Sequence, residues 1–273
     1  MNTIKKFGED RKKIVKLRKR LKLIPCLVLV LLVSTFVLIL VNNKTEAPST
    51  KLNDEKTQNP DLKDKAEVKN EETVLDIKTA ASQYVLVNKA HPLNPIDYKP
   101  SDLVSSVVAT SSSDTADERS IREIIKTDVV KMFDDAKVAN LDLIMNSGFR
   151  SSKLQSFYYN NYVKNSGEAA ANKFSAKPGY SEHQTGLAFD VSYANRKCYL
   201  EICFAETEAG KWLAEHAHEY GFILRYPNGK DSVTGYQFEP WHFRYVGKEV
   251  ARIIYEKQTT YEEYLADLGL ITL

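Results

Sequence analysis

The sequence predicts an α+β domain, in which helices surround a small antiparallel sheet, preceded by one N-terminal transmembrane helix. Three observations support this prediction. An uncharged apolar run lies near the N-terminus, and a polar, highly charged stretch follows it. In the rest of the chain, segments with helical and with strand periodicity follow one another without strict alternation. The predicted parts are a basic cytoplasmic tail (1–23), a membrane anchor (24–41), a disordered spacer (42–78) and a folded domain (79–273).

The composition fits one sizeable globular core. The 273 residues are 43% hydrophobic and 27% charged, which excludes a disordered, collagenous or low-complexity protein. Three cysteines are too few for a disulfide-built scaffold. After Val41 the chain carries 28 basic and 34 acidic side chains, so the domain has no basic surplus and we expect no binding to nucleic acid.

Residues 24–41 form the apolar run. These 18 residues carry no charge and would span about 27 Å as a helix, close to the thickness of a bilayer core. Ten basic side chains in residues 1–22 predict a cytoplasmic N-terminus and a domain outside the cell membrane. The alternative is a cleaved signal peptide, although the nearest candidate cleavage pattern, Thr45-Glu46-Ala47, is poor. Either alternative exports the domain.

The spacer is polar, and its residues 42–73 offer almost nothing to bury. A spacer between an anchor and a domain implies a substrate at some distance from the membrane. The domain itself has no visible internal repeat, and we expect it to be monomeric. Its predicted elements, in chain order, are a helix at 117–137, a strand at 142–149, a helix at 151–164, a strand at 188–193, a helix at 206–220 that ends at Gly221, strands at 222–226 and 242–246, and a helix at 248–257.

Two of the five histidines lie in unusual sequence contexts. His183 belongs to residues 181–190 (SEHQTGLAFD), and His242 to residues 239–245 (EPWHFRY). Two imidazoles and the carboxylate of Asp190 suit a zinc ion, which takes nitrogen and oxygen donors. Gly186 would let the backbone turn so that His183 and Asp190 converge. Glu239 precedes His242 and is placed to accept a proton from an attacking water. Each motif is weak when taken alone.

Together the motifs match a family. Ser-x-His-x-x-Gly-x-Ala-x-Asp, followed by Glu-Pro-Trp-His and Arg-Tyr-Val-Gly, resembles the VanY-type D-alanyl-D-alanine carboxypeptidases. The upstream residues 147–155 also fit, and the resemblance runs from about Tyr84 to Leu268. It implies a zinc peptidase of the bacterial cell wall, with the fold shared by lysostaphin-type enzymes and the hedgehog signalling domain.

The resemblance implies a role for each matching residue. The matching residues are the zinc ligands His183, Asp190 and His242, the general base Glu239, the arginine Arg150 that meets the scissile carbonyl or the terminal carboxylate, and Gln155 and Ser181, which help hold the terminal D-alanine. We expect Trp241, beside His242, to wall the same pocket. Phe149 departs from the family pattern, where tyrosine is more frequent, and its effect should be slight.

The expected activity is removal of the terminal D-alanine from peptidoglycan stem peptides ending in D-Ala-D-Ala, with one zinc ion per domain. An L,D-carboxypeptidase, which cuts D-alanine from the tetrapeptide stem, would use the same motifs and stays open. A dipeptidase fits less well, because a free cytoplasmic dipeptide requires neither anchor nor spacer. A catalytically silent binding module is the alternative from another class, although all four catalytic positions are retained.

The remaining histidines and cysteines carry no motif. His216 and His218 point to different faces of one predicted helix, so we interpret both as surface or packing residues. His91 lies in a loop flanked by proline. Cys198 and Cys203 could form an extracytoplasmic disulfide, which we favour, or remain two separate thiols.

Overall fold

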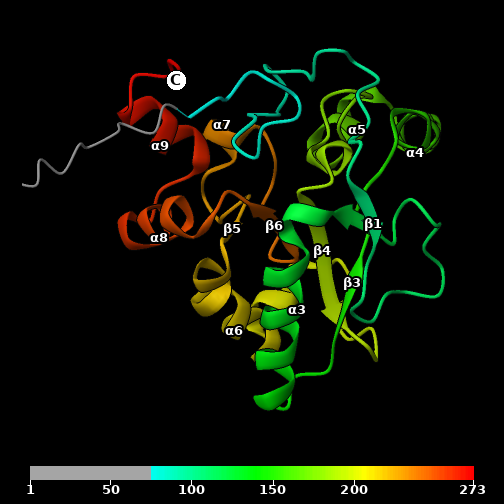
Figure 1. Cartoon of the computed structure of the whole chain (residues 1–273). Helices are drawn as coiled ribbons and strands as arrows, with labels where there is room; N and C mark the ends of the chain where they lie inside the picture. Colours follow the sequence, from blue (N-terminus) through cyan, green and yellow to red (C-terminus); the bar gives the residue numbers. More distant parts are fainter. Residues whose placement is uncertain (1–74) are drawn as a thin grey trace, which may run out of the picture. The chain divides into compact units, whose positions relative to one another are not determined.

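The computed structural model describes residues 75–273 of the chain (Figure 1). The predicted tail, the predicted membrane anchor and most of the predicted spacer lie outside these residues. Within residues 75–273, no helix is long and apolar enough to cross a bilayer.

Four short strands form the central sheet, and all neighbouring strands are antiparallel. Their order is β3-β4-β6-β5, with bounds Leu143–Asn146, Ala188–Tyr193, His242–Tyr245 and Phe222–Leu224 respectively. A separate antiparallel pair joins β1 (Leu103–Ser105) to β2 (Ser120–Arg122). The predicted α+β domain with a small antiparallel sheet is therefore confirmed.

Helices surround this sheet. Figure 1 shows α3 crossing in front of the sheet, α8 and α9 beyond the β5 edge, and α4 with α5 toward the β3 side. The helices are α3 (Glu123–Val138), α4 (Ser152–Ser166), α5 (Glu168–Phe174), α6 (Glu208–His216), α7 (Asp231–Thr234), α8 (Lys248–Lys257) and α9 (Tyr261–Asp267). Three 3-10 helices complete the described chain, namely η1 (Glu182–Thr185), η2 (Ile202–Glu206) and η3 (Ala217–Tyr220).

The two faces of the sheet differ in chemistry because successive strand residues point to opposite sides. On β4, Phe189 and Val191 belong to the main hydrophobic core, together with the buried side of α3. The intervening Asp190 is paired in register with His242 of β6 on one side and with Asn146 of β3 on the other. The opposite face of the sheet therefore brings polar side chains from three strands together.

Most predicted elements agree with the structure. The strand at 188–193 and the helix at 248–257 have the bounds that were predicted. The prediction was wrong about the start of the helix at 117–137, which begins only at Glu123. The apolar Ile121, which fits helical spacing, instead lies in β2, because that strand pairs with β1 and the backbone N–H of Arg122 bonds to the Gly186 carbonyl.

The predicted helix at 206–220 is also divided. Thr207 caps α6 by accepting a hydrogen bond from the N–H of Gly210, and the chain tightens into η3 after His216. Gly221 ends the segment with a left-handed backbone, as predicted. The favoured disulfide is confirmed, because Cys198 and Cys203 are bonded in the structure.

Candidate metal centre

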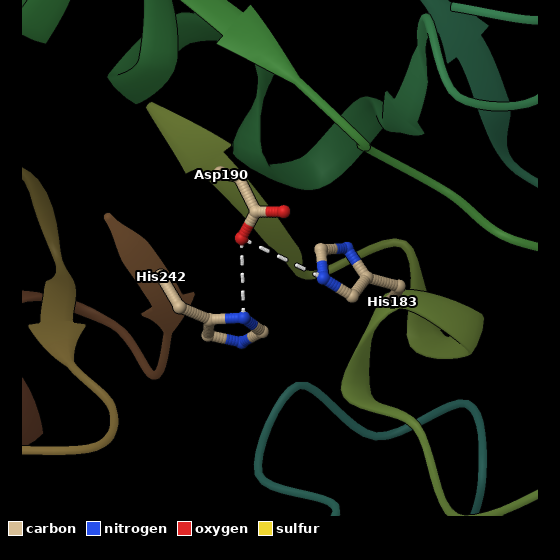
Figure 2. A group of neighbouring side chains, drawn as sticks. All are labelled: His183, Asp190 and His242. Atoms are coloured by element: carbon tan, nitrogen blue, oxygen red, sulfur yellow. Dashed lines mark ion pairs between the residues drawn. The ribbon is translucent and has the colours of Figure 1, made fainter. Parts of the chain in front are cut away.

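Three side chains from three separate elements converge on the polar face of the sheet. His183 comes from η1, Asp190 from β4 and His242 from β6, and one potential ligand atom from each lies within 4.8 Å of the other two. Figure 2 shows both imidazoles directed at one carboxylate oxygen of Asp190. This oxygen lies 3.7 Å from His183 Nε2 and 3.3 Å from His242 Nδ1. The sequence-predicted ligands therefore meet in space.

Gly186 explains the short path from His183 to Asp190. It ends η1 with a left-handed φ of 66°, a conformation that glycine adopts readily. A Cβ at this position would approach Arg122 Cγ at 3.0 Å and Leu103 Cδ2 at 3.1 Å. The predicted turn at Gly186 is therefore required by both its backbone conformation and its close packing.

Each imidazole has its second nitrogen next to an acceptor. His183 Nδ1 lies 3.1 Å from the carbonyl oxygen of Gly148. His242 Nε2 lies 3.4 Å from Oε2 of Glu182, a side chain with no solvent exposure. If these nitrogens carry the protons, the lone pairs of His183 Nε2 and His242 Nδ1 face Asp190. Acceptors of this kind fix the tautomer and orientation of metal-binding histidines.

The electrostatics of the cluster favour a cation. Burial lowers the pKa of His183 to about 3, so this ring is neutral at physiological pH. Burial would also lower the pKa of His242, but the carboxylates of Asp190 and Glu182 outweigh burial and raise it to about 9. Burial would raise the pKa of Asp190, but the two histidines outweigh burial and lower it.

The residues fit a zinc ion. The Oδ1 atom of Asp190 is buried and has no hydrogen-bond partner within residues 75–273. A buried anionic oxygen without a partner is costly, and a bound cation would remove that cost. Two imidazole nitrogens and one carboxylate oxygen are a donor set that zinc accepts.

Glu239 lies beside the cluster. Its Oε2 is 3.8 Å from His242 Nδ1, and burial raises the pKa of its carboxyl to about 7. A carboxyl group that titrates near neutral pH can both accept and return a proton. This is the property that the predicted general base needs.

Arg150 is held in place by the protein on two sides. Its backbone N–H donates to the His183 carbonyl, and its guanidinium donates to Gln155 Oε1 at 3.0 Å. The amide of Gln155 in turn donates to the Ala176 carbonyl at 2.7 Å. Gln155 thus contacts Arg150 and the backbone, so its clearest structural role is to orient Arg150. Arg150 Nε is buried and has no partner in the described part of the chain.

These side chains line one cavity of about 510 Å³. The metal-ligand cluster, Glu239, Arg150 and Gln155 all contribute to its wall. Ser181 and Trp241, both predicted to contact substrate, also line it and are 5% and 8% exposed. Every residue of the predicted site therefore opens onto the same space.

The ion network behind His242 was not predicted from the sequence. Glu182 Oε1 accepts hydrogen bonds from Arg225 at 2.7 Å and from Arg244 at 2.8 Å, and both arginines are fully buried. Arg225 also forms two hydrogen bonds with Glu262, at 2.8 and 2.6 Å. The available signal was Glu182 itself, a charged residue beside a predicted ligand.

The other described histidines lie outside the cluster. His216 Nδ1 is 3.0 Å from Glu219 Oε1, and the His218 ring stacks on Tyr255 with centroids 3.8 Å apart. His91 contacts the side chain of Asn88. The interpretation of His216 and His218 as surface or packing residues agrees with these positions.

Comparison with known proteins agrees with the geometry. The family model described as VanY, D-alanyl-D-alanine carboxypeptidase, matches residues 118–248. A solved structure of a vancomycin-resistance D,D-pentapeptidase VanY variant in complex with Zn(II) is 32% identical, with a TM-score of 0.51, and the match covers 66% of this chain and 97% of that one. This chain belongs to the VanY family.

Two further relatives are more similar in sequence. The LdcB LD-carboxypeptidase structure is 42% identical with a TM-score of 0.65, over 68% of this VanY-family chain and 87% of that chain. The putative carboxypeptidase YodJ of Bacillus subtilis is 44% identical over 179 residues, or 66% of this chain. The match spans 65% of the length of YodJ.

Proposed function

We propose that this domain is a zinc-dependent carboxypeptidase that releases the terminal D-alanine from peptidoglycan stem peptides. The observation that carries the proposal is the placement of Glu239 next to the His183–Asp190–His242 cluster, in a cavity that also contains Arg150. Membership of the VanY family supports a hydrolase, and a VanY variant was crystallised with Zn(II).

The proposed roles follow from the positions of the side chains. His183, Asp190 and His242 would hold the zinc ion, which when bound polarises a carbonyl group and makes water a stronger nucleophile near neutral pH. Glu239 takes the proton from the attacking water and then delivers it to the nitrogen of the leaving D-alanine. Its pKa of about 7 allows both transfers at one pH.

Arg150 is the positively charged side chain that would bind the substrate. A guanidinium group is a planar fork of donors that matches a carboxylate or a developing oxyanion. The Nε atom of Arg150 has no partner in the described structure, so it can donate to such a group. Recognition of a terminal carboxylate would restrict cleavage to the chain end, as a carboxypeptidase requires. Ser181 and Trp241 would contact the same terminal residue.

Two specificities are candidates. The D,D reaction expected from the motifs is supported by the family model and by the VanY variant. The L,D reaction is supported by LdcB, an LD-carboxypeptidase, which has both a higher identity and a higher TM-score with this chain. These two values favour the L,D candidate.

The test uses the zinc-loaded full-length chain and two stem peptides. One is the pentapeptide ending in D-Ala-D-Ala, and the other is the tetrapeptide ending in one D-alanine. Mass spectrometry follows D-alanine release, with a chelator and Glu239→Ala as controls. Release from the pentapeptide alone establishes the D,D reaction, and release mainly from the tetrapeptide establishes the L,D reaction. Zinc binding without cleavage of either peptide would favour the binding module.

The domain would act outside the cell membrane. We propose that residues 24–41 anchor it, with residues 1–23 in the cytoplasm, on the basis of the uncharged run and the ten basic side chains before it. Protease added to intact cells should digest the domain and leave a membrane-bound N-terminal fragment. A mature protein that begins after residue 41 would instead show a cleaved signal peptide.

A further inference from the structure

Exposed aromatic side chains gather where the cavity opens to solvent. In the part of the chain that the structure describes, the exposed aromatic residues are Phe157, Tyr162 and Phe174, and all three belong to α4 or α5. These two helices lie side by side (Figure 1). Tyr162 and Phe174, which are 41% and 38% exposed, also line the cavity. This pair is called the aromatic rim below.

The two rings of the aromatic rim form one joint surface. Their centroids lie 5.1 Å apart and their planes meet at 80°, which is an edge-to-face contact between α4 and α5. Both rings stay partly in water, although burial of such large apolar groups would be favourable. Exposed apolar side chains that gather beside a cavity commonly mark a ligand-binding surface.

One face of α4 connects the aromatic rim with Arg150. Gln155, Tyr158 and Tyr162 follow one another at spacings of three and four residues, so they share this face, and all three line the cavity. Gln155 accepts the hydrogen bond from Arg150, whose guanidinium carbon lies 5.3 Å from the centroid of the Tyr158 ring. Tyr162 follows Gln155 by two helical turns, or about 10.5 Å along the helix axis. The face therefore forms a path from Arg150 to solvent.

The length of this path indicates which part of the substrate reaches its outer end. An extended peptide rises at most about 3.3–3.6 Å per residue, so a stem of four residues spans about 13–14 Å. A stem whose terminal carboxylate is held at Arg150 therefore extends past the level of Tyr162 and brings the sugar joined to its amino end to the rim. A stem of five residues shifts this sugar by one residue, which is less than the 5.1 Å between the two ring centroids.

The chemistry of the aromatic rim fits a sugar ring. One face of a pyranose presents mainly C–H groups, and this face can pack on an aromatic ring while the hydroxyl groups at its edge stay hydrated. Tyr162 adds a phenolic hydroxyl, which can donate or accept a hydrogen bond at the edge of the sugar. The rim is therefore suited to a ligand with both an apolar face and a polar edge.

We propose that the aromatic rim binds the glycan sugar to which the stem peptide is attached. This inference rests on the proposed carboxypeptidase function and extends its substrate from the free peptide to the glycan-linked peptide. It applies to both candidate specificities, because the path along α4 leads from Arg150 to the rim for either stem. The domain would thus act preferentially on stems that are still joined to glycan.

The test compares stems with and without the sugar. Pentapeptide and tetrapeptide stems are each prepared in two forms, either N-acetylated or joined through the lactyl group to the glycan disaccharide, so that neither form carries a free terminal amine. The zinc-loaded full-length chain is assayed for kcat/KM with all four substrates. The test variant carries both Tyr162→Leu and Phe174→Leu, which keep an apolar side chain but remove the flat rings.

The matched control is Phe157→Leu. Phe157 is an exposed aromatic residue of the same helix, but it lies about 140° around α4 from Tyr162 and outside the cavity. Urea unfolding checks that each variant is folded. If the variant with both substitutions does not fold, Tyr162→Leu alone takes its place.

We expect the unmodified chain to have a kcat/KM about 10-fold higher for the disaccharide-linked form of the stem that it cuts, mainly through a lower KM. A single aromatic contact contributes about 2- to 10-fold in affinity. Loss of both rings should therefore reduce this preference to about 2-fold or less. Phe157→Leu should keep the full preference.

Two results would overturn the aromatic rim as a sugar site. One is an equal kcat/KM for the two forms of the stem that the unmodified chain cuts, and the other is a preference that survives both substitutions. Both results leave the carboxypeptidase function intact. If no stem is cut, the proposed function has failed, and calorimetric binding of the four substrates to the Glu239→Gln variant judges the rim separately. Equal affinities for the two forms of each stem would then overturn it.

Discussion

The two regions that meet at His242 differ in how many of their buried polar groups have a hydrogen-bond partner. Behind the imidazole, Glu182 accepts hydrogen bonds from Arg225 and Arg244, and all three side chains are completely buried. Glu262 pairs with Arg225, and Asn88 donates to Glu262 at 3.0 Å. Glu262 and the Oε1 atom of Glu182 are thus compensated within the protein, whereas Glu182 Oε2 and His242 Nε2, which lie 3.4 Å apart, have no hydrogen-bond partner in the described chain.

The cavity in front of the imidazole is different. Asp190 Oδ1, Arg150 Nε and Asp114 Oδ2 are buried, and none has a hydrogen-bond partner in the described chain. Buried polar groups without partners are rare in folded proteins. The rear network can fix His242 rigidly, while the front leaves its polar atoms available to a metal ion and a substrate. This contrast predicts that substitutions in front affect turnover, whereas substitutions behind affect stability and metal affinity.

The largest effect should come from Glu239→Ala, in front of the imidazole. Loss of the proposed general base should lower kcat about 10²- to 10⁴-fold. Zinc content, measured by atomic absorption on the purified chain, should stay close to one ion per domain, because the three predicted ligands remain. Retention of most activity would show that another group moves the proton.

The next largest effect should come from Glu182→Gln, behind the imidazole. This change removes the Glu182 carboxylate and leaves the charges of Arg225 and Arg244 buried. Breaking a buried ion pair in this way lowers the free energy of unfolding by about 3–5 kcal/mol. Loss of the carboxylate oxygen that faces His242 Nε2 at 3.4 Å should also weaken zinc binding about 10- to 100-fold. Urea unfolding with chelator measures the first effect, and competition with a zinc indicator measures the second.

The control for Glu182→Gln is Glu168→Gln. Glu168 forms an ion pair with Lys177 that is about half exposed on both sides. Such surface ion pairs contribute little to the free energy of unfolding, so this variant should unfold like the unmodified chain and bind zinc with the same affinity. If Glu182→Gln behaved in the same way, the rear network would have no role in holding His242.

Glu182 also shows what the sequence could and could not predict. His183, Asp190, Glu239 and His242 could be predicted as site residues because each lies inside a short motif whose spacing is visible in the chain. The partners of Glu182 are 43 and 62 residues away, and only the folded sheet brings them together. No local pattern marks such a pair.

The same reason separates the elements that were predicted well from those that were not. Helix α8 has strong helical periodicity of its own, and both its ends were predicted. Ile121 also fits helical spacing, but tertiary pairing with β1 places it in a strand. Asp114 and Arg150 lie 36 residues apart, so the sequence could not show the two charges of the cavity together.

A smaller effect should follow from Arg150→Lys, again in front. Lysine keeps the charge but loses the planar fork and the Nε donor. We expect kcat/KM to fall about 10- to 100-fold, mainly through KM if Arg150 binds the terminal carboxylate. A fall mainly in kcat would instead place Arg150 at the developing oxyanion. The matched control is Arg252→Lys, an exposed residue of α8 outside the cavity, which should have unchanged kinetics.

The smallest effect should come from replacing both Cys198 and Cys203 with serine, at the rim of the front cavity. Tyr199 and Leu200 of this loop line the cavity, and Arg196, Cys198 and Leu200 have positive φ angles of 58°, 53° and 51°. Such angles are unfavourable for residues other than glycine, so the loop needs a constraint to keep its shape. Closing so short a loop should stabilise the domain by about 2 kcal/mol or less.

The variant without both cysteines should therefore unfold at a slightly lower urea concentration and show a raised KM. Its zinc affinity should stay unchanged because the rear network is intact. Reduction of the unmodified chain should reproduce the same KM. A loss of zinc affinity in either case would show that the rim and the rear network are coupled, and the contrast between the two regions would fail.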